Sequence, residues 1–476
     1  MFSLGIASKI AAMAIGKRKG EKQETLWIPT SEIPKPPAHP FYKQLNSILN
    51  QHGFDAFVEE LCAKFYAPKM GRPGLIPGVY FRLLLIGYFE GLDSERGIAW
   101  RTADSLALRS YLGLELTEAP PDHSTISRTR RLIDLETHRA IFTWVLQRVA
   151  ESGLLKGKTI GIDATTLEAN AAMRSIVRRD TGESYQEFLT QLAKESGIET
   201  PTREDLARLD RKRDKKGSND DWTHPHDPDA RITKMKDGST HLAHKTEQAV
   251  DLETGVVVGV TVQPADTGDT TSMIETLIAA ADQVKKVLPN SAGIEEVVGD
   301  KGYHSTERIV DLERLGLRSY ISEPKRGPRR WGGKHESRNA IYRNRSRIRG
   351  SRGKALLRLR GERLERPFAH LYETGRMRRV HLRGRNNILK RVLIHVSALN
   401  LGLLMRATVG VGTPRSLQGL CKSLSSAIAL CLQDIYCAIA TATTFIRTFP
   451  NLYVPFRYMV VGPGNYAEIS TFTTGY

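Results

Sequence analysis

The chain has 476 residues, enough for two or three domains with sizeable cores. Its net charge of +18, from 70 lysines and arginines against 52 acids, is typical of proteins that bind a polyanion such as nucleic acid. Apolar residues make up 40% of the chain, which excludes a disordered protein, and four cysteines are too few for a disulfide scaffold, so a reducing cytoplasm fits.

One apolar stretch, Ser425–Ile446, is long enough to be tested as a membrane span. Gln433 and Asp434 lie at its middle, where a charge costs about 2.5–3.5 kcal/mol. We therefore expect a soluble helix there and no membrane role. The partly apolar start of the chain precedes its basic residues, the reverse of a secretory signal.

The first third of the chain predicts a helical domain. Residues 1–40 are rich in proline and predict an extended lead-in, and residues 41–155 repeat apolar side chains at helical spacing around an apolar centre, Val79–Phe89. Near its end, Asp122 or Ser124 caps a helix that carries several arginines. That basic face suits DNA phosphates or base edges, and a solvated charged face is the alternative.

Residues 156–406 predict an α/β domain. A first strand, Lys158–Thr166, is followed by a polar insertion at about 170–240, expected to hold a helical pair and then a mobile loop around Arg211–Asp229. The elements expected after it are the hairpin Leu242–Val250 with Val256–Val262, a helix at 272–287, the strand Ile294–Val298, a helix from 305 and the strand Arg318–Ser322. This order predicts a ribonuclease H-like fold: a mixed sheet with flanking helices, preceded by the α-helical N-terminal domain. Residues 407–476 are a C-terminal tail of unknown role.

Two carboxylates stand at or near the ends of apolar strands, Asp163 in the first and Asp300 directly after Val297-Val298-Gly299. Open α/β sheets bind ligands at this edge, so the two acids suggest a shared metal site. Hydrolysis or transfer of a phosphodiester needs Mg²⁺ ions about 3.5–4 Å apart, held by hard oxygen ligands. Glu365 is the candidate third ligand, and Pro367 predicts a helix start just after it. Ion pairing with neighbouring arginines is the alternative role for Glu365.

The segment from Lys325 to Arg391 holds 23 lysines and arginines and only 4 acids. Such a run predicts contacts to phosphates and a steep salt dependence of DNA binding. Trp331 within it either stacks on an unpaired base or anchors a loop on the core. The candidate DNA-binding residues are Arg128, Arg130, Arg131, Lys301, Arg329, Arg330, Trp331, Arg343, Arg345, Arg347, Arg376, Arg378, Arg379 and Arg383.

Several of these segments, taken in order, resemble a known family. They are Pro121–Arg128, Ile162–Thr165, Gly299–Tyr303, Arg363–Phe368 and Arg378–Gly384. The set is similar to bacterial insertion-sequence DDE transposases of the IS-four/IS-five-like supergroup, which carry a helical N-terminal transposase domain.

The resemblance implies a ribonuclease H-like core in which Asp163, Asp300 and Glu365 hold two Mg²⁺ or Mn²⁺ ions. It implies cleavage at terminal inverted repeats and strand transfer into target DNA, by a homodimer or larger synaptic complex acting on DNA in the bacterial cytoplasm, associated with the nucleoid. Related enzymes often carry a lysine seven residues after the third acid, where this chain has Tyr372, so Glu362 stays open as an alternative to Glu365. A nuclease of the same fold without strand transfer, and an inactive DNA-binding relic, are the alternative functions.

Overall fold

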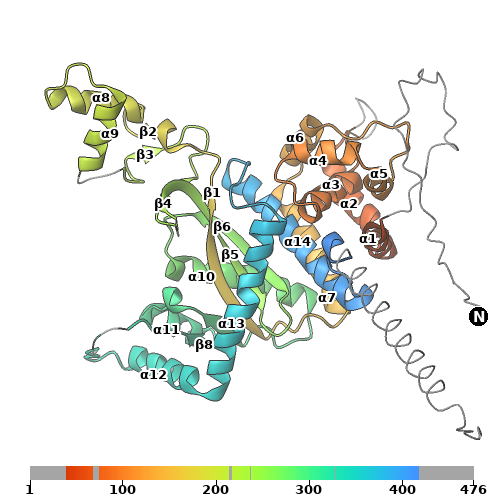
Figure 1. The fold of residues 1–476 in the computed structure, drawn as a ribbon. Coiled ribbons are helices and arrows are strands. Elements are labelled where there is room, and N and C mark those ends of the chain that lie inside the picture. The colour runs from red at the N-terminus through yellow and green to blue at the C-terminus, as the bar shows by residue number, and fades with distance from the viewer. Residues whose placement is uncertain are drawn as a thin grey trace, which may run out of the picture. The chain divides into compact units, whose positions relative to one another are not determined.

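The computed structural model describes residues 39–67, 74–213, 217–235, 237–325, 327 and 329–417 (Figure 1). Most of the expected lead-in (1–40) and C-terminal tail (407–476), including the expected soluble helix Ser425–Ile446, lies outside these residues.

The N-terminal part is helical. Its helices are α1 (Pro40–Gln51), α2 (Phe54–Cys62), α3 (Pro77–Phe89), α4 (Glu95–Ala103), α5 (Leu106–Leu112), α6 (His123–Leu132) and α7 (Leu135–Glu151). The apolar stretch predicted to be its centre forms α3, in which Phe81, Leu83 and Ile86 are fully or almost fully buried. Of the two candidate caps of α6, Asp122 is the N-cap, because its Oδ1 accepts a hydrogen bond of 2.8 Å from the backbone N–H of Ser124.

The elements of the central sheet follow one another along the chain in the predicted order, with the additional strand Arg231–Lys234. Its strands are β1 (Thr159–Glu168), β4 (Arg231–Lys234), β5 (Thr240–Asp251), β6 (Val257–Pro264), β7 (Glu296–Gly299) and β8 (Arg318–Ile321). The path runs β4-β5-β1-β7-β8, with β6 also paired to β5. Strand β1 is antiparallel to β5 and parallel to β7, and β7 is parallel to β8. The mixed sheet with this connectivity confirms the expected ribonuclease H-like fold.

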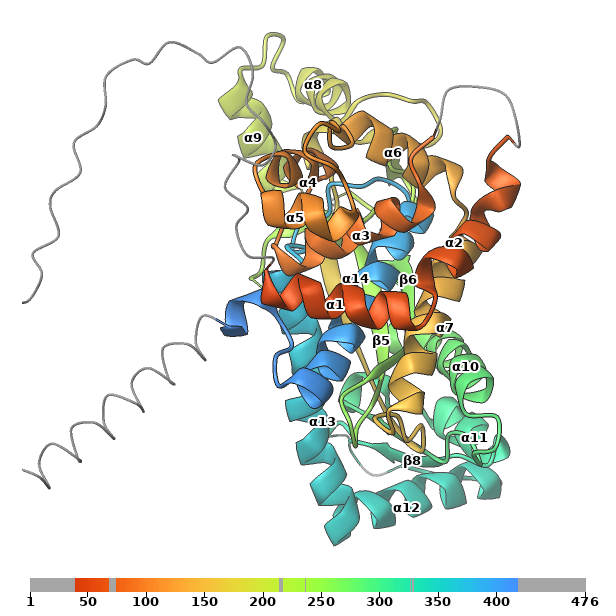
Figure 2. The same ribbon diagram turned by 90° about the vertical axis from the view of Figure 1, so that its right-hand side faces the viewer.

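Helices cover both faces of the sheet. On one face lies α10 (Asp269–Val287), which approaches so closely that a Cβ on Gly259 of β6 would lie 3.0 Å from Ala280. On the other face lies α13 (Ser351–Ala369), whose Leu364 packs over Gly161 of β1. Figure 2 shows α10 and α13 on opposite sides of β5. The remaining helices of this part are α11 (Thr306–Arg314), α12 (His335–Arg349) and α14 (Arg385–Val409).

Two buried asparagines form hydrogen bonds to the backbone of the outer strands. The side-chain amide of Asn400 in α14 bonds the backbone N–H and C=O of Val257 in β6, at 3.0 and 2.8 Å. Asn344 in α12 does the same to Ile321 of β8, at 3.1 and 2.9 Å. Both asparagines are fully buried, so these bonds satisfy edge groups that would otherwise lack partners.

The start of α13 is held on the sheet by a buried carboxylate. Glu296, at the first residue of β7, is 1% exposed and accepts bonds from Arg352 Nη2 at 2.5 Å and Thr159 Oγ1 at 2.8 Å. Burial alone would raise the pKa of Glu296, but the hydrogen bonds from Arg352 and Thr159 hold it below its ordinary value. The carboxylate is therefore ionised and fixes the helix relative to the sheet.

Helix α14 joins the helical part to the sheet. The Lys390 Nζ donates to the carbonyl oxygens of Arg130 and Ile133, at 3.0 and 2.7 Å, at the end of α6. Arg391 donates to the Leu92 carbonyl at 2.7 Å. These are the carbonyls that a helix end and a loop leave unpaired, so buried cations on α14 satisfy them.

Among the described residues, one helix, Arg385–Leu417, is long and apolar enough to be considered as a membrane span, with a mean hydropathy of 1.6. Of its most apolar window, 67% is buried inside the protein. Its contacts with α3, α7 and β6 account for this apolar composition, as for a core helix.

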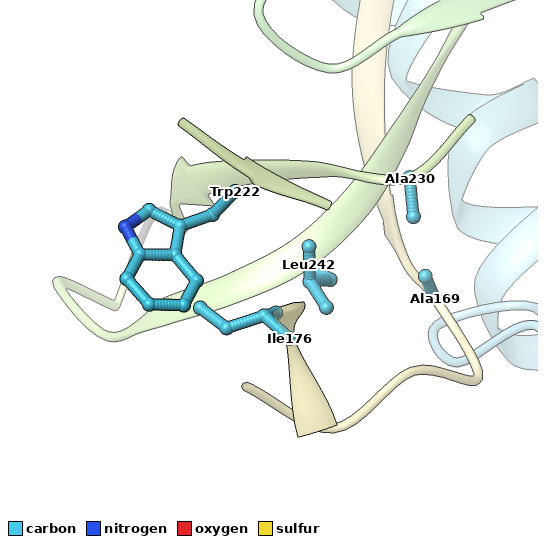
Figure 3. Packing of buried hydrophobic residues seen from close by; sticks show 5 residues of the cluster. All are labelled: Ala169, Ile176, Trp222, Ala230 and Leu242. Atoms are coloured by element: carbon cyan, nitrogen blue, oxygen red, sulfur yellow. The ribbon is translucent and has the colours of Figure 1, made fainter. Parts of the chain in front are cut away.

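The insertion between β1 and β5 holds the predicted helical pair, α8 (Tyr185–Glu195) and α9 (Arg203–Lys212). The segment around Arg211–Asp229, predicted to be a mobile loop, contains a short strand, β3 (Trp222–Thr223), which pairs with β2 (Val177–Arg178). Its Trp222 is 4% exposed. Figure 3 shows Trp222 and Ile176 gathered near Leu242 of β5, with Ala169 and Ala230 completing the cluster. This small core attaches the insertion to the end of the sheet.

Candidate active site

The two strand-end acids lie side by side. In the parallel pairing of β1 with β7, Gly161 is opposite Val298, so continuing both strands by two residues brings Asp163 next to Asp300. Residues two apart share one face of a strand, so Asp163 faces the same side as Gly161, the side that α13 covers. The sequence prediction that these acids meet at one edge is thus supported by the register.

A single arginine occupies the space between the two acids. Nη2 of Arg360 in α13 lies 2.9 Å from Asp163 Oδ2 and 3.9 Å from Asp300 Oδ2. The Arg360 side chain is 17% exposed, and its Nε is buried without a hydrogen-bond partner. Two carboxylates this close repel each other, so the guanidinium neutralises part of that repulsion.

Gly302 permits the tight turn after Asp300. The backbone N–H of Gly302 donates to Asp300 Oδ1 at 2.8 Å, and a Cβ at position 302 would lie 3.0 Å from that oxygen and 2.6 Å from Asp269 Oδ2. Asp269 in turn accepts a 2.6 Å bond from Lys245 Nζ. The glycine in the Asp-Lys-Gly-Tyr motif is therefore required by the close approach of two acids.

The tyrosine of the same motif is buried against a further acid. Tyr303 donates its hydroxyl to Glu247 Oε1 at 2.8 Å, and both residues are almost completely buried. Burial and the neighbouring Glu247 raise the pKa of Tyr303, so its hydroxyl stays a donor. Burial also raises the pKa of Glu247, against the hydrogen bonds that it accepts from Thr276 and Ser272. This network supports the turn that presents Asp300.

One more polar side chain beside the acids has no partner. Gln248 of β5 is directly opposite Asp163 in the antiparallel ladder, so the two side chains share a face with Cβ atoms about 4.5–5.5 Å apart. Gln248 is fully buried, and neither its Oε1 nor its Nε2 makes a hydrogen bond. A buried amide normally finds partners, so this one indicates a site for a polar ligand or water.

The structure does not bring the expected third acid to this pair. Glu365 is exposed, and at 100° per residue it lies about 140° around α13 from Arg360. The alternative, Glu362, is also exposed and pairs with Arg366 at 3.2 Å. Among the described residues there is no group of three or more His, Cys, Asp and Glu side chains placed to hold a metal ion.

The expected helix start at Pro367 is wrong, and this matters for the third acid. Helix α13 begins at Ser351 and runs through Pro367, which is buried with Leu364 and Phe368 against the rest of the protein. A proline inside a helix removes one backbone hydrogen bond, and the π-helical turn His370–Thr374 follows directly. The packing of α13 on the sheet compensates for the lost hydrogen bond. The same packing orients the helix so that Arg360 faces the two acids.

Four of the candidate DNA-binding arginines share two glutamates as ion-pair partners within the protein. They are Arg329, Arg343, Arg345 and Arg347. Their partners are Glu313 and Glu323, with contacts as short as 2.5 and 2.6 Å. Hydrogen bonds from the arginines hold the pKa of both acids below the ordinary value. Arg343, Arg345 and Arg347 anchor α12 through these pairs, which reduce the positive charge available to an external anion. Trp331 is half-buried, with the Arg329 guanidinium 5.7 Å above its ring.

Other candidates are exposed. On α6, Arg128 and Arg131 are exposed, whereas Arg130 is paired with Glu95 at 2.7 Å in a half-buried position. The exposed candidates elsewhere are Lys301, Arg330, Arg376, Arg378, Arg379 and Arg383. Arg378 and Arg379 lie 2.9 Å from Glu373 and 3.6 Å from Glu168, and such exposed pairs are weak enough to exchange for phosphates.

Comparison with known protein families finds two matches in the chain. Residues 31–132 match the transposase domain DUF772, and residues 217–401 match the transposase DDE domain. The chain belongs to the DDE transposase family. No curated protein and no solved structure matches it. The two matches do not distinguish supergroups, so the IS-four/IS-five assignment stays a prediction.

DDE transposases act on DNA, and the family uses divalent metal ions. In this transposase the DDE match includes Asp300, Arg360 and Glu365 but begins after Asp163. The two adjacent carboxylates and the unpartnered Gln248 amide fit a hard divalent ion with its waters. The third protein ligand is not in place.

The sequence did not predict the positions of Arg360 and Gln248 or the hydrogen bond between Glu247 and Tyr303. Of these residues only Tyr303 belongs to a recognisable motif, so only Tyr303 could have been found from the sequence.

Proposed function

We propose that this transposase cleaves DNA at the terminal inverted repeats of an insertion sequence and joins the 3′ ends to target DNA. Asp163 and Asp300 are the proposed ligands of Mg²⁺ or Mn²⁺, two ions per site, with Glu365 as the third ligand. The observation that carries the proposal is the placement of Asp163 and Asp300 around one guanidinium nitrogen, at 2.9 and 3.9 Å. Two acids far apart in the chain thereby form one anionic site that needs a cation.

Each residue has a physical role in this proposal. The metal ions, when bound, neutralise the phosphodiester and activate the attacking hydroxyl. Asp163 and Asp300 supply the negative charge that holds them, and Gly302 fixes the Asp300 carboxylate through its N–H. Gln248 has a free amide beside Asp163 that can orient a water or a phosphate oxygen. Glu365 reaches the pair only if α13 turns or its local path changes, since the helix now presents Arg360.

The exposed basic residues are the proposed DNA contacts. They include Arg128 and Arg131 on α6, and Lys301 directly after Asp300. Cleaving and joining two ends requires both ends in one assembly, so the active species is proposed to be a homodimer or larger complex on DNA in the cytoplasm. Light scattering with and without inverted-repeat DNA tests this. A complex containing one chain with two bound ends would contradict it.

A strand-transfer assay tests the chemistry. Precut ends, a target plasmid and Mg²⁺ are combined with the wild-type chain, with Asp163→Asn and Asp300→Asn, and with Arg358→Gln as a matched control. Arg358 is exposed and lies about 200° around α13 from Arg360, so its loss is expected to leave joining intact. Joined products from the wild type and control, and none from the two asparagine variants, support the proposal.

One alternative has an observation in its favour. The outward position of Glu365 and the arginine between the other acids also fit an inactive, DNA-binding relic. In that case DNA binding persists while cleavage and joining are absent in the wild type. Cleaved ends without joined products would instead favour a nuclease of the same fold.

A further inference from the structure

A cavity away from the acid pair is lined by arginines. It lies where α3, α13, α14 and the turn between β5 and β6 meet, and its lining includes Arg363, Arg366 and Arg406 together with His370. Among the residues that the structure describes, no aspartate or glutamate lines it. Its volume is about 50 Å³, whereas one water needs about 10–15 Å³, so it can hold a group of several oxygen atoms. We call it the arginine pocket.

The positive charge of the arginine pocket is largely uncompensated. Arg363 Nε is buried without a partner, and its Nη1 makes only a long bond of 3.4 Å to the Thr254 carbonyl oxygen. In the part of the chain that the structure describes, Arg363 and Arg406 make no ion pair. Arg366 pairs only with Glu362, where both side chains are more than half exposed. An exposed pair of this kind contributes little and exchanges readily.

The pKa of the histidine in the pocket, His370, is lowered by burial and by the positive charge of the neighbouring arginines. These arginines are Arg406 and Arg366. His370 is therefore neutral at pH 7 and can donate a hydrogen bond without adding charge. Arg363 is half-buried, whereas Arg366 and Arg406 are exposed, so the three guanidinium groups line a site that solvent reaches. Like charges this close repel one another, and a bound anion would relieve that repulsion.

We propose that the arginine pocket binds a phosphate of the DNA backbone. Arginine is the side chain best matched to phosphate, because its planar group donates two parallel hydrogen bonds. Arg363 and Arg366 follow Arg360 on the same helix by three and six residues, or about 4.5–9 Å along its axis. At about 3.4 Å per nucleotide step this corresponds to one to three nucleotides. The pocket would thus hold the strand a few nucleotides from the acid pair, an inference that rests on the proposed function.

Inorganic phosphate tests the site itself. Binding to the full chain is measured by calorimetry at constant ionic strength, with the wild type, the double variant Arg363→Gln/Arg406→Gln, and Arg349→Gln as a control for the loss of an exposed arginine. We expect the double variant to bind phosphate at least tenfold more weakly and the control to match the wild type. Equal affinity in all three proteins, including a lack of binding in all three, would overturn the pocket. If the double variant does not fold, Arg406→Lys keeps the charge, and a severalfold loss is expected because the planar fork is gone.

Short duplex DNA tests the source of the phosphate. The slope of log K against log salt concentration changes by about 0.9 for each DNA phosphate that the protein neutralises, so the double variant is expected to show a slope smaller by about one. An unchanged slope together with weakened phosphate binding would mean a site for free anions and would overturn the DNA assignment. Asp300→Asn is expected to keep both properties. A wild-type chain that has both properties but joins no DNA would contradict the proposed function and leave the pocket standing.

Discussion

Replacing Arg360 by glutamine is expected to tighten the binding of divalent metal ions. Arg360 Nη2 occupies the space between Asp163 and Asp300, so a metal ion bound by the two carboxylates must displace it. In Arg360→Gln that displacement is no longer required. The variant should also lose stability without metal, because the two acids then face each other with less compensating charge.

The size of the effect follows from the geometry. A hydrogen bond between charged groups contributes about 1.5–3 kcal/mol, and 1.4 kcal/mol corresponds to a tenfold change in affinity. The 2.9 Å contact to Asp163 joins side chains that are 17% and 26% exposed, so little of its value is lost to solvent. The 3.9 Å contact to the more exposed Asp300 is counted as zero. We therefore expect roughly tenfold to hundredfold tighter binding.

Titration calorimetry with Mn²⁺ on the full chain measures this directly. Arg358→Gln removes the same charge from the outer side of the same helix and is expected to bind Mn²⁺ as the wild type does. Asp163→Asn is expected to abolish the binding. Equal Mn²⁺ affinity for Arg360→Gln and Arg358→Gln would refute the idea that the arginine and the metal compete for one place.

Three further changes test the supports of the site. Gly302→Ala places a Cβ 3.0 Å from Asp300 Oδ1, and relieving the clash should weaken Mn²⁺ binding by about 1–3 kcal/mol; unchanged affinity in calorimetry would contradict this. Asn400→Leu leaves two backbone groups of the edge strand unsatisfied, at about 1–3 kcal/mol each, and should lower the free energy of unfolding in urea; a decrease of less than about 1 kcal/mol would argue against the edge contact. The pKa of Glu296 is held below its ordinary 4.5, so the stability it contributes is present above that pH and is lost as the pH falls. Glu296→Gln should therefore be less stable at pH 7, and its stability should fall less below pH 4.5, in thermal melts; parallel pH curves would exclude the pairing with Arg352 as the cause.

The strands and the pair of acids were predictable because they depend on local signals. A run of apolar β-branched residues ending at an acid marks a strand end, and parallel strands bring their carboxyl ends together. The rotation of α13 was not predictable in this way. Which of Arg360, Glu362 and Glu365 faces the sheet depends on where the helix starts, and Pro367 suggested a start far later than Ser351. The ion pairs of α12 were missed for a similar reason, because their partners Glu313 and Glu323 lie outside the segment that is rich in arginine.

The buried cations on α14 have a consequence for where the DNA is cut. Lys390 closes the end of the arginine-bearing helix α6, and Arg391 closes the loop before α4, from a helix that is itself packed on the sheet. The helix that we propose to contact DNA and the strands that carry the acids are therefore packed against the same helix. If α6 binds the duplex as proposed, α14 fixes the distance from α6 to the acids. We then expect that distance to set the number of base pairs between the bound sequence and the cleaved bond.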